Sequence, residues 1–370
     1  MKKKDSQKNM YAHSEKKVEL LQKYLEIYLN VLSNTFVKRI NLFDLFCGPG
    51  IYENEGIGSP FIMLQEIKKA STINNKKAIE YNCLFNDNDR EVIEVLKRNV
   101  KSKIDHCYAK INYSCQDYKD VIRATILSMQ ELLNSEKAFA FIDPYQYKDI
   151  SISEIESMLC TKKTEILLFL PTQFMFRFES NGTPKSLKRF IEELVPMEEW
   201  PKSNTGIDFI QSLKEHFKNH LGNDYYVDTF IIQREVNQYF SLFFFTSNIL
   251  GFEKMLEAKW KIDKDEGRGW IYEHSYNLFS GNKSSITQKF ENELKEYLSR
   301  SRTNKEVYEF TLHNGHLPKH TNEVLKAWQN EGILSVLKSD GEQTIKGSFY
   351  LNYKDWRDHP GKVTIQTKLQ

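Results

Sequence analysis

The sequence predicts an α/β protein with a doubly wound, mainly parallel sheet, an antiparallel hairpin at one sheet edge, and a C-terminal winged-helix domain. Short apolar runs alternate with amphipathic helical stretches along the first two thirds of the chain. The run 138–142 is apolar without alternation, as strands buried on both faces of a sheet are. From residue 286 the pattern changes to three helices and a hairpin, so we expect an α/β domain over 15–270 and a winged helix over 286–355.

The sheet domain is expected to begin with a helix over 15–33, whose apolar residues follow helical spacing. The predicted parallel strands are 39–46, 78–85, 111–115, 138–142 and 165–170, and the helices between the first four are 60–69, 90–100 and 120–133. A further helix is expected over 206–221. Strands 225–233 and 239–246 are joined by a short polar link that allows only a hairpin. An antiparallel edge pair after five parallel strands is typical of nucleoside-binding methyltransferase sheets.

The C-terminal part follows a helix over 251–260 and a charged linker over 263–269. Its predicted helices are 286–298, 304–312 with Thr303 as cap, and 319–330, and its predicted strands are 333–337 and 347–352. Three helices and a hairpin predict a winged helix. At the other end of the chain, the Lys-rich segment 1–14 is expected to be disordered.

Composition excludes several classes of protein. The 52 Lys and Arg residues nearly balance the 50 Asp and Glu, so overall charge does not favour nucleic acid or membrane binding. The five cysteines form no CxxC or CxxH spacing, and we expect no metal site. No apolar run approaches about 20 residues and no secretory signal is present. We therefore expect a cytoplasmic protein with reduced thiols and no membrane partner.

The first motif is Asn41-Leu42-Phe43-Asp44-Leu45-Phe46-Cys47-Gly48-Pro49-Gly50, an apolar strand that runs into a glycine turn. Ligands of open α/β sheets bind beyond the carboxyl ends of the strands, where glycines let the backbone approach them closely. A carboxylate at the end of a buried strand also needs a partner. We interpret Asp44, Phe46, Gly48 and Gly50 as part of an S-adenosylmethionine site, with Asp44 orienting the amino acid end of the cofactor. A plain strand-to-helix turn is the alternative.

Two more carboxylates follow the next strands. Asp87, after the second strand, is placed to accept hydrogen bonds from ribose hydroxyls, while Asn88 or Asp89 caps the next helix. Asp117, after the third strand, could receive the adenine amino group or be an ordinary turn residue. A third glycine near position 53 is missing, which disfavours a dinucleotide site.

The fourth strand ends in Asp143-Pro144-Tyr145. In amino-methyltransferases an acid or amide, prolines and an aromatic residue at this place bind the target amine and stack on the base. We therefore expect Asp143, Pro144 and Tyr145 to form the acceptor site. A cytosine-C5 enzyme would need a Pro-Cys nucleophile here, and the sequence has none.

Together with Gly58-Ser59-Pro60, Phe85-Asn86-Asp87-Asn88-Asp89 and the stretch 251–263, these motifs resemble the three-Cys-motif partner family, TcmP. The similarity spans about residues 15 to 350. It implies a class I methyltransferase-like fold, a C-terminal winged-helix-like part, and a neighbouring protein with a three-cysteine, radical-SAM-like motif as partner. Most members resemble Asp-Pro-Phe-Gly where this chain has Asp143-Pro144-Tyr145-Gln146.

The third helix of the winged helix is the one expected to enter a major groove. Its candidate nucleic-acid contacts are Lys319, His320, Thr321, Asn322 and Lys326. Residues 286–370 hold 13 Lys and Arg against 11 Asp and Glu, a balance of only +2, so strong nonspecific DNA binding is not predicted. A solvated face or a protein-binding winged helix is an equal alternative.

The leading hypothesis from the sequence is an S-adenosylmethionine-dependent methyltransferase that acts on a nucleic acid, with amino-group methylation favoured. The rival is a catalytically inactive methyltransferase fold that serves as a binding module for the radical-SAM-like partner, because fold alone does not establish activity. A third interpretation, an enzyme that modifies a small nucleotide, leaves the winged helix without a role.

Overall fold

The computed structural model describes residues 9–73, 79–104, 108–144, 150–170, 172, 205–235, 238–271 and 285–368. The chain divides into two compact units, which we call the sheet unit and the winged-helix unit. The sheet unit comprises Met1–Lys254 and Gly269–Ser275, and the winged-helix unit Met255–Arg268 and Tyr276–Gln370. Among the described helices, none combines the length and the apolar character needed to cross a membrane.

The sheet unit is built on an eight-stranded sheet with the order β3-β2-β1-β4-β5-β7-β6-β8. The strands are β1 (Arg39–Asp44), β2 (Glu80–Asn86), β3 (Ala109–Ser114), β4 (Glu136–Ile142), β5 (Thr164–Leu170), β6 (Tyr226–Glu235), β7 (Gln238–Thr246) and β8 (Gly269–Ile271). The first five are parallel, and β7 is antiparallel to both β5 and β6. The predicted fold class is confirmed. The short β8, parallel to β6, was not predicted and begins where the charged linker was expected to end.

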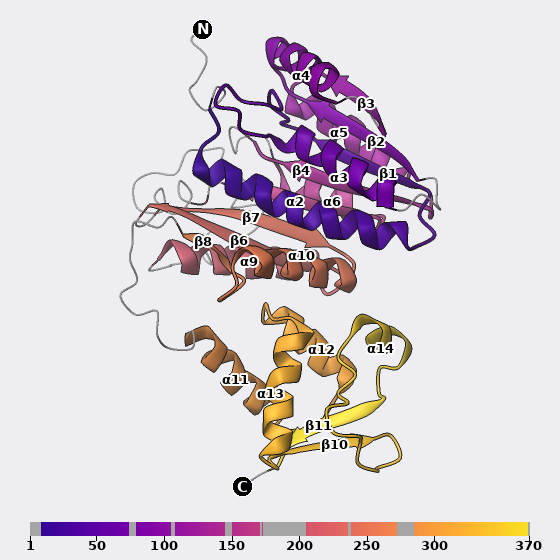
Figure 1. Cartoon of the computed structure of the whole chain (residues 1–370), viewed down its shortest axis with the longest axis vertical. Helices are drawn as coiled ribbons and strands as arrows, with labels where there is room; N and C mark the ends of the chain where they lie inside the picture. Colours follow the sequence, from indigo (N-terminus) through magenta and orange to yellow (C-terminus); the bar gives the residue numbers. More distant parts are fainter. Residues whose placement is uncertain are drawn as a thin grey trace. The chain divides into compact units, whose positions relative to one another are not determined.

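Helices cover both faces of this sheet, and Figure 1 shows α2 running along one of them. The helices of the sheet unit are α2 (Ala12–Ser33), α3 (Ser59–Ile73), α4 (Arg90–Lys103), α5 (Tyr118–Gln130), α6 (Ile152–Leu159) and α9 (Gly206–Leu221), followed by α10 (Ile249–Ile262), which continues into the winged-helix unit. Tyr24 of α2 packs against Phe139 of β4. On the opposite face, Phe217 of α9 packs against Phe243 and Phe245 of β7. Successive strand residues point to opposite faces, so both faces carry an apolar core.

The first described residues are held in place by hydrogen bonds to the loop that contains Asn54. The Met10 N–H donates to the side-chain oxygen of Asn54 (3.1 Å), and the Asn54 amide donates back to the Met10 carbonyl (2.9 Å). Helix α2 begins at Ala12, three residues before the predicted start. The expectation of a disordered segment over 1–14 is therefore wrong for residues 10–14, while residues 1–8 lie outside the described residues.

The winged-helix unit contains the three expected helices and a three-stranded sheet of order β10-β11-β9. Its elements are α11 (Ser285–Tyr297), β9 (Arg302–Thr303), α12 (Asn304–His313), α13 (Pro318–Asn330), β10 (Leu334–Lys338), α14 (Tyr353–Asp358) and β11 (Val363–Thr367). Thr303 caps α12 as predicted, in a capping box with Glu306.

The predicted second wing strand, 347–352, is wrong. The partner of β10 is β11, which pairs with it in antiparallel register from Leu334 opposite Thr367 to Lys338 opposite Val363. The side chains of Val363, Ile365 and Thr367 are buried in alternation with less buried neighbours, which is the pattern of a strand with one core face. The winged-helix fold therefore extends to residue 367, beyond the predicted boundary at 355.

A buried acid lies under α2, among the first residues of β5. Glu165 accepts hydrogen bonds from the Tyr24 hydroxyl and from the Thr246 hydroxyl, the latter at 2.9 Å. Burial raises the pKa of Glu165 to about 7, against the opposing effect of these two hydrogen bonds. Near neutral pH the native protein therefore holds a proton on Glu165 that the unfolded chain has lost.

This proton predicts a pH dependence of stability. Because the pKa of Glu165 rises from 4.5 to about 7 on folding, the free energy of unfolding falls as pH rises from about 4.5 to 7. Between pH 5 and pH 8 the free energy of unfolding of the unsubstituted protein should fall by about 2 to 3 kcal/mol more than that of Glu165→Gln, because the amide cannot ionise. Urea unfolding of both proteins at the two pH values measures the difference. Equal losses in both would contradict the assignment.

Candidate functional site

Three neighbouring strands bring acidic residues to one edge of the sheet. In the register of β2, β1 and β4, Asp44 lies beside Phe85 on one side and Phe141 on the other. Asp87 and Asp143 each follow two residues after those phenylalanines. Since the carboxyl ends of parallel strands meet at one edge, the three carboxylates gather there, at the place where ligands of open α/β sheets bind.

Asp44 is fully buried, at 0% exposure. Within the described part of the chain, neither carboxylate oxygen makes a hydrogen bond of normal geometry. Burial raises the pKa of Asp44 to about 7. The nearby Ser59 hydroxyl and Phe46 backbone N–H offset this only in part, and the Asp143 carboxylate adds to it. A buried carboxylate without a counter-charge costs free energy, so a cation beside Asp44 would be stabilised there.

The turn after β1 depends on its glycines. Gly48 and Gly50 have φ angles of 61° and 74°, in the left-handed region that favours glycine. A Cβ on Gly50 would also lie 2.5 Å from Leu96, so this position has no room for a side chain. The Gly50 carbonyl accepts a 2.7 Å hydrogen bond from the Gly58 N–H, which closes the loop between them.

That loop forms a small hairpin over residues 51–57, held by an antiparallel bridge between Ile51 and Ile57 and by a 3.0 Å hydrogen bond from the Tyr52 N–H to the Gly56 carbonyl. Burial and then the carboxylates of Asp143 and Asp44 raise the pKa of the Tyr52 hydroxyl. Tyr52 therefore lies near the acidic edge, although no motif in the sequence indicates it.

Asp87 is buried, and its Oδ1 accepts a 2.9 Å hydrogen bond from the Asp89 N–H. Asp89 in turn caps α4 by accepting from the Glu91 N–H at 2.8 Å. The neighbouring Asn86 donates to the Leu45 and Gln116 carbonyls and accepts from the Gln116 N–H. This one buried amide thus joins the segments that follow β1 and β3 to the end of β2.

The remaining two cofactor candidates, Phe46 and Asp117, are less buried than Asp44 and Asp87. Phe46 is half-buried and stacks on Tyr118 at the start of α5, with ring centroids 5.3 Å apart. Asp117 is exposed, directly precedes α5, and makes no side-chain capping hydrogen bond. Its side chain lies near the edge of the sheet but is not enclosed there.

Asp143 carries an ion pair that the sequence did not predict. Its Oδ2 lies 2.5 Å from the Nζ of Lys17, on α2. Lys17 is itself buried, at 7% exposure, and its ammonium lies 4.0 Å from the ring centroid of Phe169 in β5. Pro144 is buried directly after Asp143, and Tyr145 lies outside the described residues.

Aromatic rings continue from Phe169 toward the start of α2. Phe240 stacks on Phe169 (5.8 Å), and His13 stacks on Phe240 (5.6 Å) and on Tyr11 (5.7 Å). Burial and the charge of Lys17 lower the pKa of His13 to about 4, so this ring is neutral at pH 7. His13 and Lys17 are four residues apart on one helix face, which is the only sequence signal that could have linked them.

The nucleic-acid candidates of α13 separate into two groups. Lys319, Asn322 and Lys326 recur at helical spacing on the outer face, where both lysines are exposed. Thr321 is fully buried and its hydroxyl bonds that of Thr311 at 2.8 Å, so the prediction for Thr321 is wrong.

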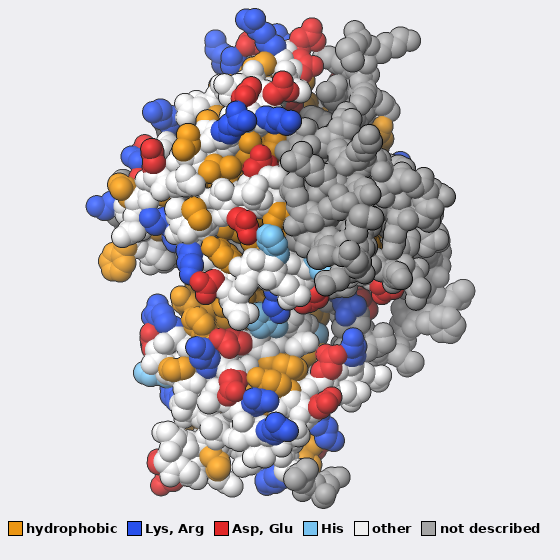
Figure 2. All heavy atoms as spheres, turned by 180° about the vertical axis from the view of Figure 1, so that it is seen from behind, with side chains coloured by type: hydrophobic (Ala, Val, Ile, Leu, Met, Phe, Trp, Pro, Cys, Tyr) orange, Lys and Arg blue, Asp and Glu red, His pale blue; other side chains and the backbone are white. Residues whose placement is uncertain are grey.

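His320 is also part of the helix framework. Its ring nitrogen accepts from the Leu317 N–H at 3.1 Å, and its ring centroid lies 4.2 Å from that of Trp260. Burial lowers the pKa of His320 to about 4, so it is neutral at pH 7 and cannot attract a phosphate as a cation. Figure 2 shows basic and acidic side chains intermixed on the face that it presents, in keeping with the small net charge.

Comparison with known protein families finds a match in the C-terminal part of the chain. Residues 274–341 match a family model described as the GMT-like wHTH domain. No curated protein matches the chain. Similar solved structures include an O-methyltransferase from Bacillus cereus in complex with SAH (8% identity, 61% of this chain and 80% of that chain, TM-score 0.32). Another is the O-methyltransferase TomG from Streptomyces achromogenes in complex with SAM (9% identity, covering 64% of this chain and 90% of that chain, TM-score 0.34).

The fold assignment of the sheet unit rests on its own strand order and not on these structures, whose TM-scores are below 0.5. The strand order and the helices on both faces define the sheet unit as a class I methyltransferase-like sheet, and the matched domain defines a winged helix after it. In the described part of the chain, no group of three or more His, Cys, Asp or Glu side chains is placed to hold a metal ion.

The unpaired Asp44 carboxylate predicts a gain in stability when it is replaced. At pH 8 it is mostly ionised and buried without a counter-charge, so Asp44→Asn should raise the free energy of unfolding of the free protein by about 1 to 3 kcal/mol. Denaturant unfolding measures this. The exposed Asp117→Asn is the control and should change stability by less than about 0.5 kcal/mol. A loss of stability in Asp44→Asn would show that the carboxylate already has a stabilising partner.

Proposed function

We propose that this protein is an S-adenosylmethionine-dependent methyltransferase that acts on a nucleic acid, with an amino group as the favoured acceptor. The observation that carries the proposal is the buried, unpartnered carboxylate of Asp44 at the carboxyl end of β1. S-adenosylmethionine carries an ammonium group on its amino acid end, which is the counter-charge that Asp44 lacks. When bound, the cofactor supplies an activated methyl group on a sulfonium.

The residues at the sheet edge fit the parts of this cofactor. Asp44 would hold the ammonium, and the glycine turn at Gly48 and Gly50 leaves the backbone open to close approach. Asp87 would accept hydrogen bonds from the ribose hydroxyls. Phe46 would contact the cofactor beside the turn, and Asp117 would receive the adenine amino group.

Asp143, Pro144 and Tyr145 would form the acceptor site. A carboxylate beside the methyl donor can accept hydrogen bonds from an exocyclic amine and so hold its nitrogen in line with the methyl group. The ion pair with Lys17 limits the rotation of Asp143 and fixes its second oxygen.

The winged helix would present the nucleic acid. Lys319, Asn322 and Lys326 form the outward face of α13, with two cations for phosphates and an amide for a base edge. His320 and Thr321 are not part of this proposal, because they hold the helix in place. A radical-SAM-like three-cysteine partner and a cytoplasmic location are proposed on the sequence resemblance alone.

The cofactor assignment predicts binding of S-adenosylmethionine and S-adenosylhomocysteine with micromolar affinity in calorimetric titration. Asp87→Ala should abolish binding, whereas Asp120→Ala, an exposed acid outside the site, should leave it unchanged. Because the pKa of free Asp44 is about 7, the carboxyl must lose its proton to hold an ammonium, so affinity should rise from pH 6 to pH 7.5. This rise should disappear in Asp44→Asn. A folded protein that binds neither ligand at millimolar concentration would favour the inactive binding module.

The acceptor assignment predicts that methyl label from S-adenosylmethionine appears in a nucleic acid when single-stranded and double-stranded DNA and RNA pools are incubated with the full chain. Asp143→Ala should stop transfer while cofactor affinity stays within about twofold. Lys326→Glu should weaken nucleic-acid binding and reduce its salt dependence, whereas Lys354→Glu, an exposed lysine on α14, should not. Equal loss of cofactor binding and transfer in Asp143→Ala would instead place Asp143 in the cofactor site.

A further inference from the structure

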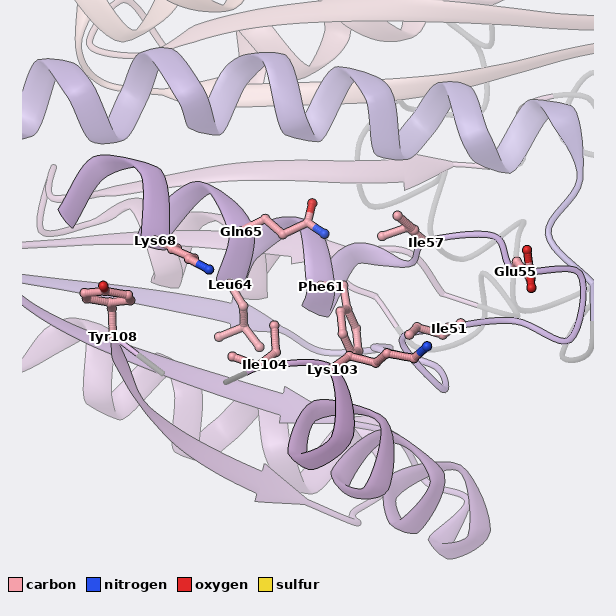
Figure 3. A pocket seen from close by; sticks show the side chains of 10 residues that line it. All are labelled: Ile51, Glu55, Ile57, Phe61, Leu64, Gln65, Lys68, Lys103, Ile104 and Tyr108. Atoms are coloured by element: carbon pink, nitrogen blue, oxygen red, sulfur yellow. The ribbon is translucent and has the colours of Figure 1, made fainter. Parts of the chain in front are cut away.

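A cavity lies in the sheet unit between α3, the end of α4 and the hairpin over residues 51–57 (Figure 3). Its volume is about 470 Å³, within the range of small-molecule sites. Its lining residues are Ile51, Glu55, Ile57, Phe61, Leu64, Gln65, Lys68, Lys103, Ile104 and Tyr108. It shares no residue with the acidic edge formed by Asp44, Asp87 and Asp143, so it is a separate place in the fold.

The floor of the cavity is apolar. Phe61 and Leu64 of α3 are buried beneath it, and Figure 3 shows Ile104 beside Leu64. Ile57 and Tyr108, at 42% and 37% exposure, are among the large apolar side chains that the protein leaves in water. Covering such surface with an apolar ligand is favourable, and the rings of Phe61 and Tyr108 suit a flat ligand.

The rim of the cavity carries a net positive charge. Lys68 and Lys103 contribute two ammonium groups, and Glu55 is the one acid among the lining residues. Neither ammonium makes an ion pair with a described carboxylate, although nearby lysines on the same helices do. Lys69 of α3 pairs with Glu66 at 2.6 Å, and Lys97 of α4 pairs with Glu94 at 2.9 Å. An anionic group on a ligand would therefore find, at the edge of an apolar cavity, two ammonium groups that no described carboxylate pairs with.

We propose that this cavity is a ligand site for a small amphipathic anion, with a flat apolar body held between Phe61, Leu64 and Tyr108 and a carboxylate, sulfonate or phosphate group held by Lys68 or Lys103. The site needs no S-adenosylmethionine, so it stands whether or not the cofactor assignment holds. A nucleoside monophosphate and an aromatic carboxylate both have this chemistry.

The test uses the full chain and the aromatic sulfonate 8-anilinonaphthalene-1-sulfonate as fluorescent probe. We expect one bound probe per chain and at least a tenfold loss of affinity in the double variant Lys68→Glu, Lys103→Glu. The matched control is Lys101→Glu, an exposed lysine of α4 that does not line the cavity, and its affinity should stay within about twofold. Far-UV circular dichroism checks that each variant is folded.

An uncharged analogue, N-phenyl-1-naphthylamine, tests the charge. It should bind the native protein at least tenfold more weakly than the sulfonate and should not distinguish the lysine variants. Equal sulfonate affinity in the double variant and the native protein would overturn the proposal. Displacement of the probe by S-adenosylhomocysteine, together with loss of probe affinity in Asp87→Ala, would also overturn it, because the probe would then occupy the acidic edge.

Competition identifies the kind of ligand. Displacement by adenosine monophosphate but not by 2-naphthoate assigns a nucleotide, and the reverse assigns an aromatic acid. If neither displaces the probe at millimolar concentration, the proposed ligand class is wrong.

Discussion

The register of β2, β1 and β4 is the constraint on which the candidate site depends. Phe85 and Phe141 flank Asp44 in adjacent parallel strands, and all three positions are buried, so a slip of one residue would move each side chain to the opposite face, where it does not fit the packing. That register also determines where each strand ends, and it thereby places the carboxylates of Asp44, Asp87 and Asp143 at the same edge. Asn86 then bonds the segments after β1 and β3, so the loops at this edge cannot move apart independently.

The sequence was sufficient to predict this edge because the signals are local. An apolar run that ends in Asp44 or Asp143 is readable from adjacent residues, and parallel topology gathers such ends together. The ion pair between Lys17 and Asp143 joins residues 126 positions apart, and nothing near either residue indicates the other. Tyr52 was missed for a different reason, since its place depends on the closure of the loop between Gly50 and Gly58.

The winged helix shows the same division between local and distant signals. Helix positions and the Thr303 cap were predictable from periodicity and capping residues. The periodicity that predicts a helix does not make all of its polar residues one surface: Thr321 lies two positions after Lys319 and so on a different face, in the core. The wing strand was misplaced because a strand-like run at 347–352 lies nearer in sequence to β10 than its true partner, β11.

The hairpin over residues 51–57 serves two parts of the sheet unit at once. Tyr52 lies near the carboxylates of Asp44 and Asp143, while Ile51 and Ile57 line the cavity beside α3. One short hairpin thus contributes side chains to both places. A ligand that shifts the hairpin from one side would change the affinity of a ligand on the other, and thermodynamic reciprocity requires the two effects to be equal.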